Sequence, residues 1–146
     1  MQRILFVCTG NTCRSPMAEA ILKNKNIEGV EVKSAGIFAE NGGEASDHVK
    51  KVLNDHNIPH QHQSSMLTKK EVDWADLILT MTSSHKFAIL DRYLDAEVKV
   101  YTLKEFTGED FNQDVVDPFG GNLAIYQKTY QELERLIDKA IEKLNL

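Results

Sequence analysis

Two cysteines near the start of the chain, Cys8 and Cys13, are the side chains best suited to covalent chemistry. They are the only cysteines among 146 residues and lie five positions apart in the stretch VCTGNTCRSP, with Arg14 and Ser15 directly after the second. A cysteine attacks as its thiolate, and a guanidinium offers a planar fork of donors that suits phosphate oxygens. We therefore expect Cys8 to be a thiolate at neutral pH, with a hydrogen bond from Ser15, and to attack a bound phosphoryl group.

The elements expected around this stretch would aim its backbone at one point. Residues 3–7 form a short apolar run that predicts a buried strand, and Ser15 followed by Pro16 is typical of a helix start with Ser15 as the N-cap. A loop between a strand and a helix N-terminus presents N–H groups and the positive end of the helix dipole to an anion. Gly10 and Asn11 tolerate the unusual dihedral angles that such a loop needs. A buried structural cysteine beside a chance arginine would explain neither the loop nor the helix start.

The rest of the chain alternates strands and helices, which predicts one α/β domain over residues 1–146. Apolar or alternating runs predict further strands at 30–35, 76–81 and 97–102. Helical periodicity and start signals predict helices at about 15–24, 45–56, 83–93 and 126–144. Strands separated by helices favour a parallel sheet with right-handed crossovers. Ligands bind such sheets at the carboxyl ends of the strands, where the cysteine loop lies.

Composition and charge are typical of an ordinary soluble globular protein. The chain is 42% hydrophobic and 27% charged, and its net charge of −5 gives no reason to expect nucleic acid as a partner. The apolar runs are too short for a membrane span or a signal-peptide core, so we expect no membrane partner and a cytoplasmic location. The sequence does not reveal the oligomeric state, and we expect a monomer.

The stretch CTGNTCRSPMAEA resembles the phosphate-binding loop of the low-molecular-weight protein tyrosine phosphatase family. The resemblance covers nearly the whole chain, including SAG at 34–36, ADLILTM at 75–81 and DPFGG at 117–121. It implies a flavodoxin-like three-layer fold with a four-stranded parallel sheet flanked by helices. It also implies that phosphorylated proteins are hydrolysed through a cysteinyl-phosphate intermediate, with no cofactor and no metal.

The same resemblance assigns roles to individual residues. Cys8 is the nucleophile, Arg14 binds the phosphoryl oxygens, and Asn11 and Ser15 hold the loop. The phosphate-binding positions are Thr9, Gly10, Asn11, Thr12, Cys13, Arg14 and Ser15. His62, in the stretch PHQHQSS, matches the histidine that supports this loop in the family, although an ordinary surface position is equally open.

A cysteinyl-phosphate mechanism also needs an acid that protonates the leaving group and a base that activates water. The segment DVVDPFGG offers Asp114 and Asp117. Asp-Pro is also a plain turn signal, but the family places its acid directly before a proline, which selects Asp117. Phe119 matches the aromatic residue that walls the substrate cleft in the family.

The substrate class depends on Thr12. Family members that act on phosphotyrosine usually carry Ile or Leu before the second loop cysteine, whereas those that resemble protein arginine phosphatases carry threonine. An apolar wall would leave guanidinium N–H groups unpaired, at a cost of roughly 1–3 kcal/mol each, and a threonine hydroxyl can accept one. The stretch DPFGG lacks the pair of tyrosines that often follows the proline in tyrosine phosphatases of this family. The loop after SAG lacks the tryptophan that many of those enzymes place against a phenyl ring, and it carries the acidic Glu40 instead. We therefore predict phosphoarginine in proteins as the substrate, with phosphotyrosine as the alternative.

Cys13 has two interpretations, a small buried filler or the partner of Cys8 in a reversible disulfide. The family is known for the disulfide, which would protect the nucleophile from over-oxidation. The histidines at 56, 60 and 62 cluster in the sequence, but no cysteine lies near them and the mechanism needs no metal, so a metal site is not favoured.

Three other classes of protein explain the sequence less well. A thiol-linked arsenate reductase needs further cysteines downstream, and none follows Cys13. A non-catalytic phosphoprotein-binding module would be expected to lack Cys8, Arg14 or Asp117, and all three are present. A simple thiol-redox protein would leave Arg14 and Asp117 unexplained.

Overall fold

The computed structural model describes residues 2–109 and 112–146. Its four strands form one parallel sheet in the order β2-β1-β3-β4. The strands are β1 (Gln2–Cys8), β2 (Val30–Gly36), β3 (Leu77–Thr80) and β4 (Val100–Thr102). The helices are α1 (Arg14–Asn24), α2 (Asp47–Asp55), α3 (Lys69–Trp74), α4 (Ser83–Arg92), α5 (Leu103–Phe106) and α6 (Leu123–Lys143), with a 3-10 helix η1 (Leu94–Lys99). The single-domain α/β architecture predicted from the sequence is confirmed.

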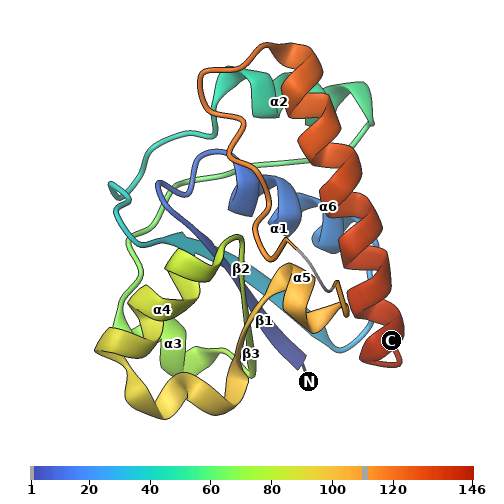
Figure 1. Cartoon of the computed structure of the whole chain (residues 1–146). Coiled ribbons are helices and arrows are strands. Elements are labelled where there is room, and N and C mark those ends of the chain that lie inside the picture. The colour runs from blue at the N-terminus through green and yellow to red at the C-terminus, as the bar shows by residue number, and fades with distance from the viewer. Residues whose placement is uncertain (1, 110–111) are drawn as a thin grey trace.

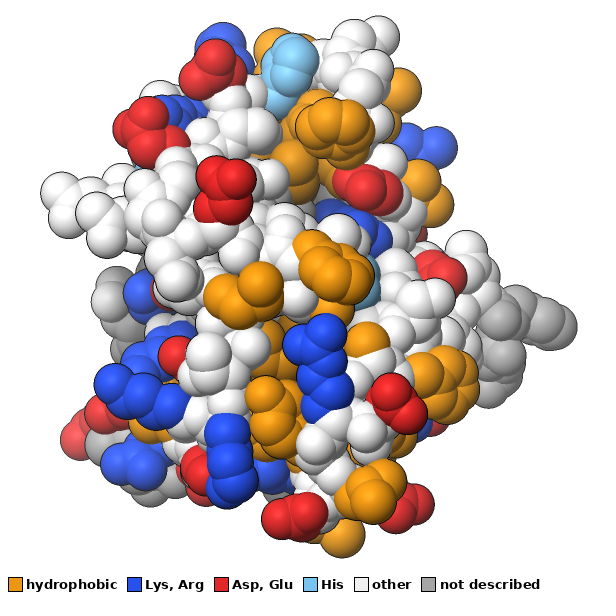
Figure 2. All heavy atoms as spheres, turned by 90° about the vertical axis from the view of Figure 1, so that its left-hand side faces the viewer, with side chains coloured by type: hydrophobic (Ala, Val, Ile, Leu, Met, Phe, Trp, Pro, Cys, Tyr) orange, Lys and Arg blue, Asp and Glu red, His pale blue; other side chains and the backbone are white. Residues whose placement is uncertain are grey.

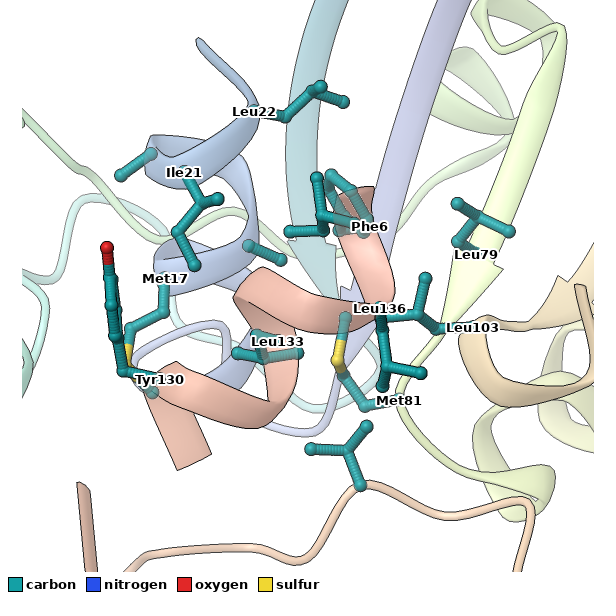
Figure 3. Packing of buried hydrophobic residues seen from close by; sticks show 14 of the residues in the cluster. Phe6, Met17, Ile21, Leu22, Leu79, Met81, Leu103, Tyr130, Leu133 and Leu136 are labelled. Atoms are coloured by element: carbon teal, nitrogen blue, oxygen red, sulfur yellow. The ribbon is translucent and has the colours of Figure 1, made fainter. Parts of the chain in front are cut away.

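The sheet lies between two layers of helices (Figure 1). Side chains alternate between the two faces of β1: Ile4 and Phe6 join the core cluster that contains α1 and α6, whereas Leu5 and Val7 join the cluster that contains α3 and α4. Figure 3 shows the larger core, to which β1 contributes Phe6, α1 contributes Met17 and α6 contributes Leu136. Each fully buried side chain of this kind contributes roughly 1.5–3 kcal/mol, so burial on both faces fixes β1 firmly at the centre.

The topology places the end of β1 at the binding edge of the sheet. β2 lies on one side of β1 and β3 on the other, so the strand order reverses at the carboxyl end of β1, where ligands bind in such folds. Gly36, at the end of β2, is paired with Cys8. A Cβ atom on Gly36 would lie 2.5 Å from the Thr9 carbonyl oxygen and 2.9 Å from the Asn11 nitrogen. Only glycine lets β2 approach the loop so closely.

Several predicted boundaries were wrong. Residues 97–99 belong to η1, and β4 begins only at Val100. The alternating pattern placed Val98 on a buried face of a longer strand, but the Val98 side chain is exposed, so no burial favours extending the strand to it. The helix predicted from residue 45 begins at Asp47, because Ser46 is its N-cap and accepts a hydrogen bond from Val49 N.

The sequence prediction also missed two short helices, α3 and α5. Both begin with a capping box, Thr68 with Glu71 and Thr102 with Glu105. The pattern Thr-x-x-Glu was therefore a readable signal for both. Among the described helices, none combines the length and the apolar character that crossing a membrane would require.

Candidate active site

The loop that joins β1 to α1, from Cys8 to Arg14 and called here the Cys8–Arg14 loop, has the backbone of an anion site. Cys13 is the N-cap of α1 and provides no side-chain cap. Within residues 2–109 and 112–146, no protein acceptor takes a hydrogen bond from the backbone N–H groups of positions 9–14. Free N–H groups at a helix N-terminus, with the positive end of its dipole, bind a phosphate oxygen well.

Ser15 differs from the prediction. α1 begins at Arg14, one residue early, so Ser15 lies inside the helix and is not its N-cap. The Ser15 hydroxyl instead lies 2.8 Å from Cys8 Sγ and accepts a hydrogen bond of 2.7 Å from Asn11 Nδ2. With the Ser15 oxygen occupied by the amide, its own hydrogen can point at the sulfur, which stabilises a thiolate.

Asn11, rather than Gly10, adopts the unusual backbone conformation of the loop. Its φ is 57°, and Gly10 is not among the residues with positive φ. Asn11 is the side chain type that best tolerates this region. Its buried amide also donates to Ser34 Oγ at 2.9 Å and accepts from Ser65 N at 2.9 Å, so these bonds help to hold the strained residue.

His62 lies behind the loop, close to Glu19. His62 Nε2 donates to the Asn11 carbonyl at 2.6 Å, and its Nδ1 lies 3.6 Å from Glu19 Oε1. Ser34 Oγ donates to the same carboxylate oxygen at 2.5 Å. Burial acts to raise the pKa of Glu19, but hydrogen bonds from His62, Lys23 and Ser34 outweigh it and lower that pKa. Glu19 therefore remains a charged anchor for the side chains that hold the loop.

The neighbouring histidines do not join His62 in a cluster. His56 stacks on Tyr130, with ring centroids 4.0 Å apart, and His60 contacts Asn54. In the described part of the chain, no group of three or more His, Cys, Asp or Glu side chains is placed to hold a metal ion.

Arg14 is 4% exposed and points its guanidinium into the site. Its Nη1 donates to the Val115 carbonyl at 2.9 Å, and its Nη2 lies 3.6 Å from Asp117 Oδ2. Its Nε is buried and has no partner among the described residues. An unpaired buried donor is costly, so Nε is positioned to bind an acceptor that enters the cleft.

Asp117 and Phe119 come from the segment before α6 and lie at the cleft. The Asp117 side chain is 52% exposed, and its Oδ1 accepts a hydrogen bond of 3.0 Å from Phe119 N. The cleft measures about 260 Å³ and is lined by Cys8, Thr9, Gly10, Thr12, Cys13, Arg14, Asp117 and Phe119. The structure thus brings together the predicted residues in front of the loop, while Asn11, Ser15 and His62 lie behind it.

Cys13 is buried, and both cysteines are free thiols in this structure. Its Sγ lies 3.5 Å from the Tyr126 hydroxyl and 3.7 Å from Ser46 Oγ. Burial and the contact with Cys13 raise the pKa of Tyr126 to about 12, so the phenol stays protonated. The disulfide between Cys8 and Cys13 remains a prediction.

His85, on α4, is a part of the site that the sequence prediction missed. Its Nε2 lies 2.8 Å from Thr9 Oγ1, and the residue is buried. Burial, followed by the charge of Arg14, lowers the pKa of His85 to about 4, while Asp114 and Asp117 act in the opposite direction. The imidazole is therefore neutral near pH 7. A single histidine on a predicted helix carried no signal of this contact.

The neutral state of His85 makes stability depend on pH. Because its pKa is 6.5 in the unfolded chain and about 4 when folded, only the unfolded chain binds this proton between those values. Stability is therefore complete above pH 6.5 and falls as the pH drops toward 4. We expect wild type to lose roughly 2 kcal/mol more than His85→Gln between about pH 7.5 and pH 5. Urea unfolding at both pH values measures the two losses, and equal losses would contradict the assignment.

Figure 2 shows the face toward which the carboxyl ends of the strands point, with hydrophobic side chains near its middle and charged ones around them. Phe119, which lines the cleft, is exposed. Val116 in the same segment, Phe38, and Phe87 on α4 are also large, exposed hydrophobic residues. Phe38 N donates to the Thr9 carbonyl, which ties its segment to the Cys8–Arg14 loop. Such a surface suits contact with another protein better than with a free small ion.

Residues 3–146 match the family described as "Low molecular weight phosphotyrosine protein phosphatase". The chain is 55% identical over 143 residues to a protein named protein-arginine-phosphatase from Geobacillus stearothermophilus, covering 97% of this chain and 95% of the relative. It is 42% identical over 137 residues to the low molecular weight protein-tyrosine-phosphatase PtpB of Staphylococcus haemolyticus, covering 94% and 96%. A solved structure titled "YwlE arginine phosphatase", a cysteine-to-serine mutant with a phosphorylated active-site serine, superposes with a TM-score of 0.93 at 44% identity, covering 99% and 96%.

Proposed function

Because the chain belongs to the low molecular weight phosphotyrosine protein phosphatase family, we propose that it hydrolyses phosphoarginine in proteins through a phosphorylated Cys8. The observation that carries this proposal is a cleft that combines the Cys8 sulfur and the Arg14 guanidinium with the Thr12 side chain. The first two suit a phosphoryl group, and Thr12 suits a polar leaving group. The relative named protein-arginine-phosphatase supports this choice.

The Cys8–Arg14 loop binds the phosphoryl group. The free N–H groups of positions 9–14 donate to its oxygens, and the buried Nε of Arg14 gains the acceptor that it lacks. The incoming phosphoryl charge also competes with Asp117 for Arg14 Nη2, now 3.6 Å from the carboxylate. Release from Arg14 lets the Asp117 carboxyl turn toward the leaving group.

In the first step, the Cys8 thiolate attacks phosphorus. An S–P bond forms as the bond between phosphorus and the guanidinium nitrogen breaks, and protonated Asp117 gives its proton to that nitrogen. The Ser15 hydroxyl, 2.8 Å from Cys8 Sγ, stabilises the thiolate before attack. The products of this step are an unmodified arginine side chain and phosphocysteine.

In the second step, the Asp117 carboxylate takes a proton from water, which attacks phosphorus. The S–P bond breaks, inorganic phosphate leaves, and the Cys8 thiolate is restored. A related structure with a phosphorylated serine in place of its active-site cysteine supports a covalent intermediate at this position. The cycle uses no cofactor or metal.

Phosphotyrosine is the second candidate substrate, since the chain is also similar to a protein named as a tyrosine phosphatase. Thr12 favours phosphoarginine over it, because a hydroxyl can accept a guanidinium N–H that a phenyl ring does not offer. Phosphoproteins, rather than free phospho-amino acids, fit the exposed hydrophobic residues around the cleft. The cytoplasmic location and the monomeric state remain predictions.

Replacing Thr12 with isoleucine tests the proposal. We expect Thr12→Ile to lower kcat/KM on a phosphoarginine protein by about tenfold or more, the cost of one or two unpaired N–H groups, and to raise the relative rate on a phosphotyrosine peptide. Thr12→Ser, which keeps the hydroxyl, is the matched control. Steady-state kinetics with both substrates measures the preference, and an unchanged preference in Thr12→Ile would count against the role of Thr12.

A further inference from the structure

The hydroxyl of Thr9 is held at the cleft by a buried histidine. Thr9 is exposed and lines the cleft, whereas His85 is 7% exposed and does not line it. His85 Nε2 lies 2.8 Å from Thr9 Oγ1 although the residues are 76 positions apart. His85 N donates to Thr82 Oγ1 at 3.2 Å, so the N-cap of α4 fixes the residue that carries the imidazole.

The buried ring indicates which nitrogen carries the proton. His85 Nδ1 is buried and has no partner among the described residues. An unpaired buried N–H is more costly than an unpaired lone pair, so the proton lies on Nε2 and is donated to Thr9 Oγ1. Burial and Arg14 hold the pKa of the ring near 4 against the effects of Asp114 and Asp117, so this single-proton form persists at neutral pH.

This arrangement leaves the Thr9 oxygen with bonding capacity toward the cleft. A hydroxyl has one hydrogen and two lone pairs, and His85 occupies only one lone pair. The second lone pair can accept an N–H. Thr12 also lines the cleft, so two threonines, rather than one, line the space that a leaving group would occupy. A phosphorylated guanidinium has several N–H groups to satisfy, whereas the ring of phosphotyrosine has none.

We propose that Thr9 is a second specificity-determining residue for the guanidinium of phosphoarginine, and that His85 is the positioning residue that fixes its hydroxyl. This inference rests on the proposed function and extends it to a residue pair outside the Thr12 position. It explains why a polar imidazole is buried beneath an exposed threonine, where an apolar side chain would pack without leaving Nδ1 unpaired.

The test is the ratio of kcat/KM for a phosphoarginine protein to kcat/KM for a phosphotyrosine peptide. Thr9→Val removes the hydroxyl and keeps the shape, and we expect the ratio to fall about tenfold. Thr9→Ser keeps the hydroxyl and should restore the ratio to within about twofold. His85→Phe keeps a flat ring without the N–H and should lower the ratio as Thr9→Val does. In the double variant the two effects should not add, because both remove the same contact.

Each outcome decides one question. A ratio unchanged in Thr9→Val, or equal losses on both substrates, would overturn the inference and leave the pair a purely structural brace. If thermal unfolding shows that His85→Phe does not fold, the Thr9 variants still test the inference, because Thr9 is an exposed residue. If wild type hydrolyses phosphotyrosine but not phosphoarginine above a Cys8→Ser blank, the proposed substrate fails and this inference fails with it. Wild type that hydrolyses neither would overturn the phosphatase mechanism itself.

Discussion

Replacing Cys8 with serine is expected to abolish turnover of phosphoarginine and phosphotyrosine substrates alike, by at least about 10⁴-fold. The reason is that a serine hydroxyl is a far weaker nucleophile than a thiolate. A related cysteine-to-serine mutant carries a phosphorylated active-site serine, so any phosphoserine that forms here should persist and block further turnover. The fold should survive, because Cys8 to serine changes one buried atom at the end of β1. Steady-state phosphate release measures turnover, and thermal unfolding checks that the variant folds.

A second readout separates lost chemistry from lost binding in Cys8→Ser. The Cys8–Arg14 loop and Arg14 are intact in this variant, so inorganic phosphate should still bind, and titration calorimetry can measure it. A variant that binds phosphate but does not turn over fits a nucleophile. Retention of more than about one per cent of wild-type turnover would contradict the assignment of Cys8.

Replacing Asp117 with asparagine is expected to lower kcat on phosphoarginine by roughly 10²–10⁴-fold. Guanidine is a strongly basic leaving group and needs the proton that Asp117 supplies. p-Nitrophenol leaves readily as its anion, so p-nitrophenyl phosphate should still phosphorylate Cys8 in this variant. Because the base for water is also missing, the second step should then be slow, and rapid-mixing kinetics should show a burst of about one p-nitrophenol per enzyme.

Asp114→Asn is the matched control for Asp117→Asn. Asp114 lies three residues earlier in the same segment and accepts a hydrogen bond of 2.8 Å from Ser83 N instead of lining the cleft. We expect its turnover to stay within about threefold of wild type. If Asp114→Asn shows the burst and Asp117→Asn does not, the acid has been assigned to the wrong aspartate.

The chemistry of the loop could be predicted because it is local in the sequence. Cys8, Arg14 and Ser15 lie within eight consecutive residues between a strand and a helix, so their proximity follows from chain connectivity alone. The sheet could be predicted for a similar reason, since alternating strands and helices permit few parallel arrangements. Asp117 was selected by family resemblance, and only the fold brings it to within 3.6 Å of Arg14.

One error at the loop and one choice that the sequence left open have the same physical cause. Ser15 followed by Pro16 suggested an N-cap, but the hydroxyl of Ser15 contacts Cys8, which leaves the N–H groups at the helix start free. Gly10 and Asn11 were both predicted to tolerate the strained dihedral angles. Asn11 is the residue that adopts them, and it adds side-chain bonds that glycine could not make. Local rules describe an ordinary helix start, and they fail where the start is left open for an anion.

The residues alone could not predict the supports behind the loop, because these contacts connect positions that are distant in the sequence, and His62 was named only through the family resemblance. Glu19 and His62 meet across 43 positions, and Thr9 and His85 meet across 76. Hydrogen bonds of this kind depend on how α4 and the 59–63 segment pack against the sheet, and no periodicity encodes that packing. Ser34 lies in the SAG stretch that carried part of the resemblance, but its hydrogen bond with Asn11 was not predicted.

The most direct test of the central claim is a competition in one reaction. Wild-type protein is mixed with a phosphoarginine protein and a phosphotyrosine peptide, Cys8→Ser provides the blank, and mass spectrometry follows the loss of each modification. We predict that phosphoarginine disappears at least about tenfold faster at equal concentration, and that the blank removes no more than about one phosphoryl group per enzyme molecule. Faster loss of phosphotyrosine would contradict the account and identify the protein as a tyrosine phosphatase.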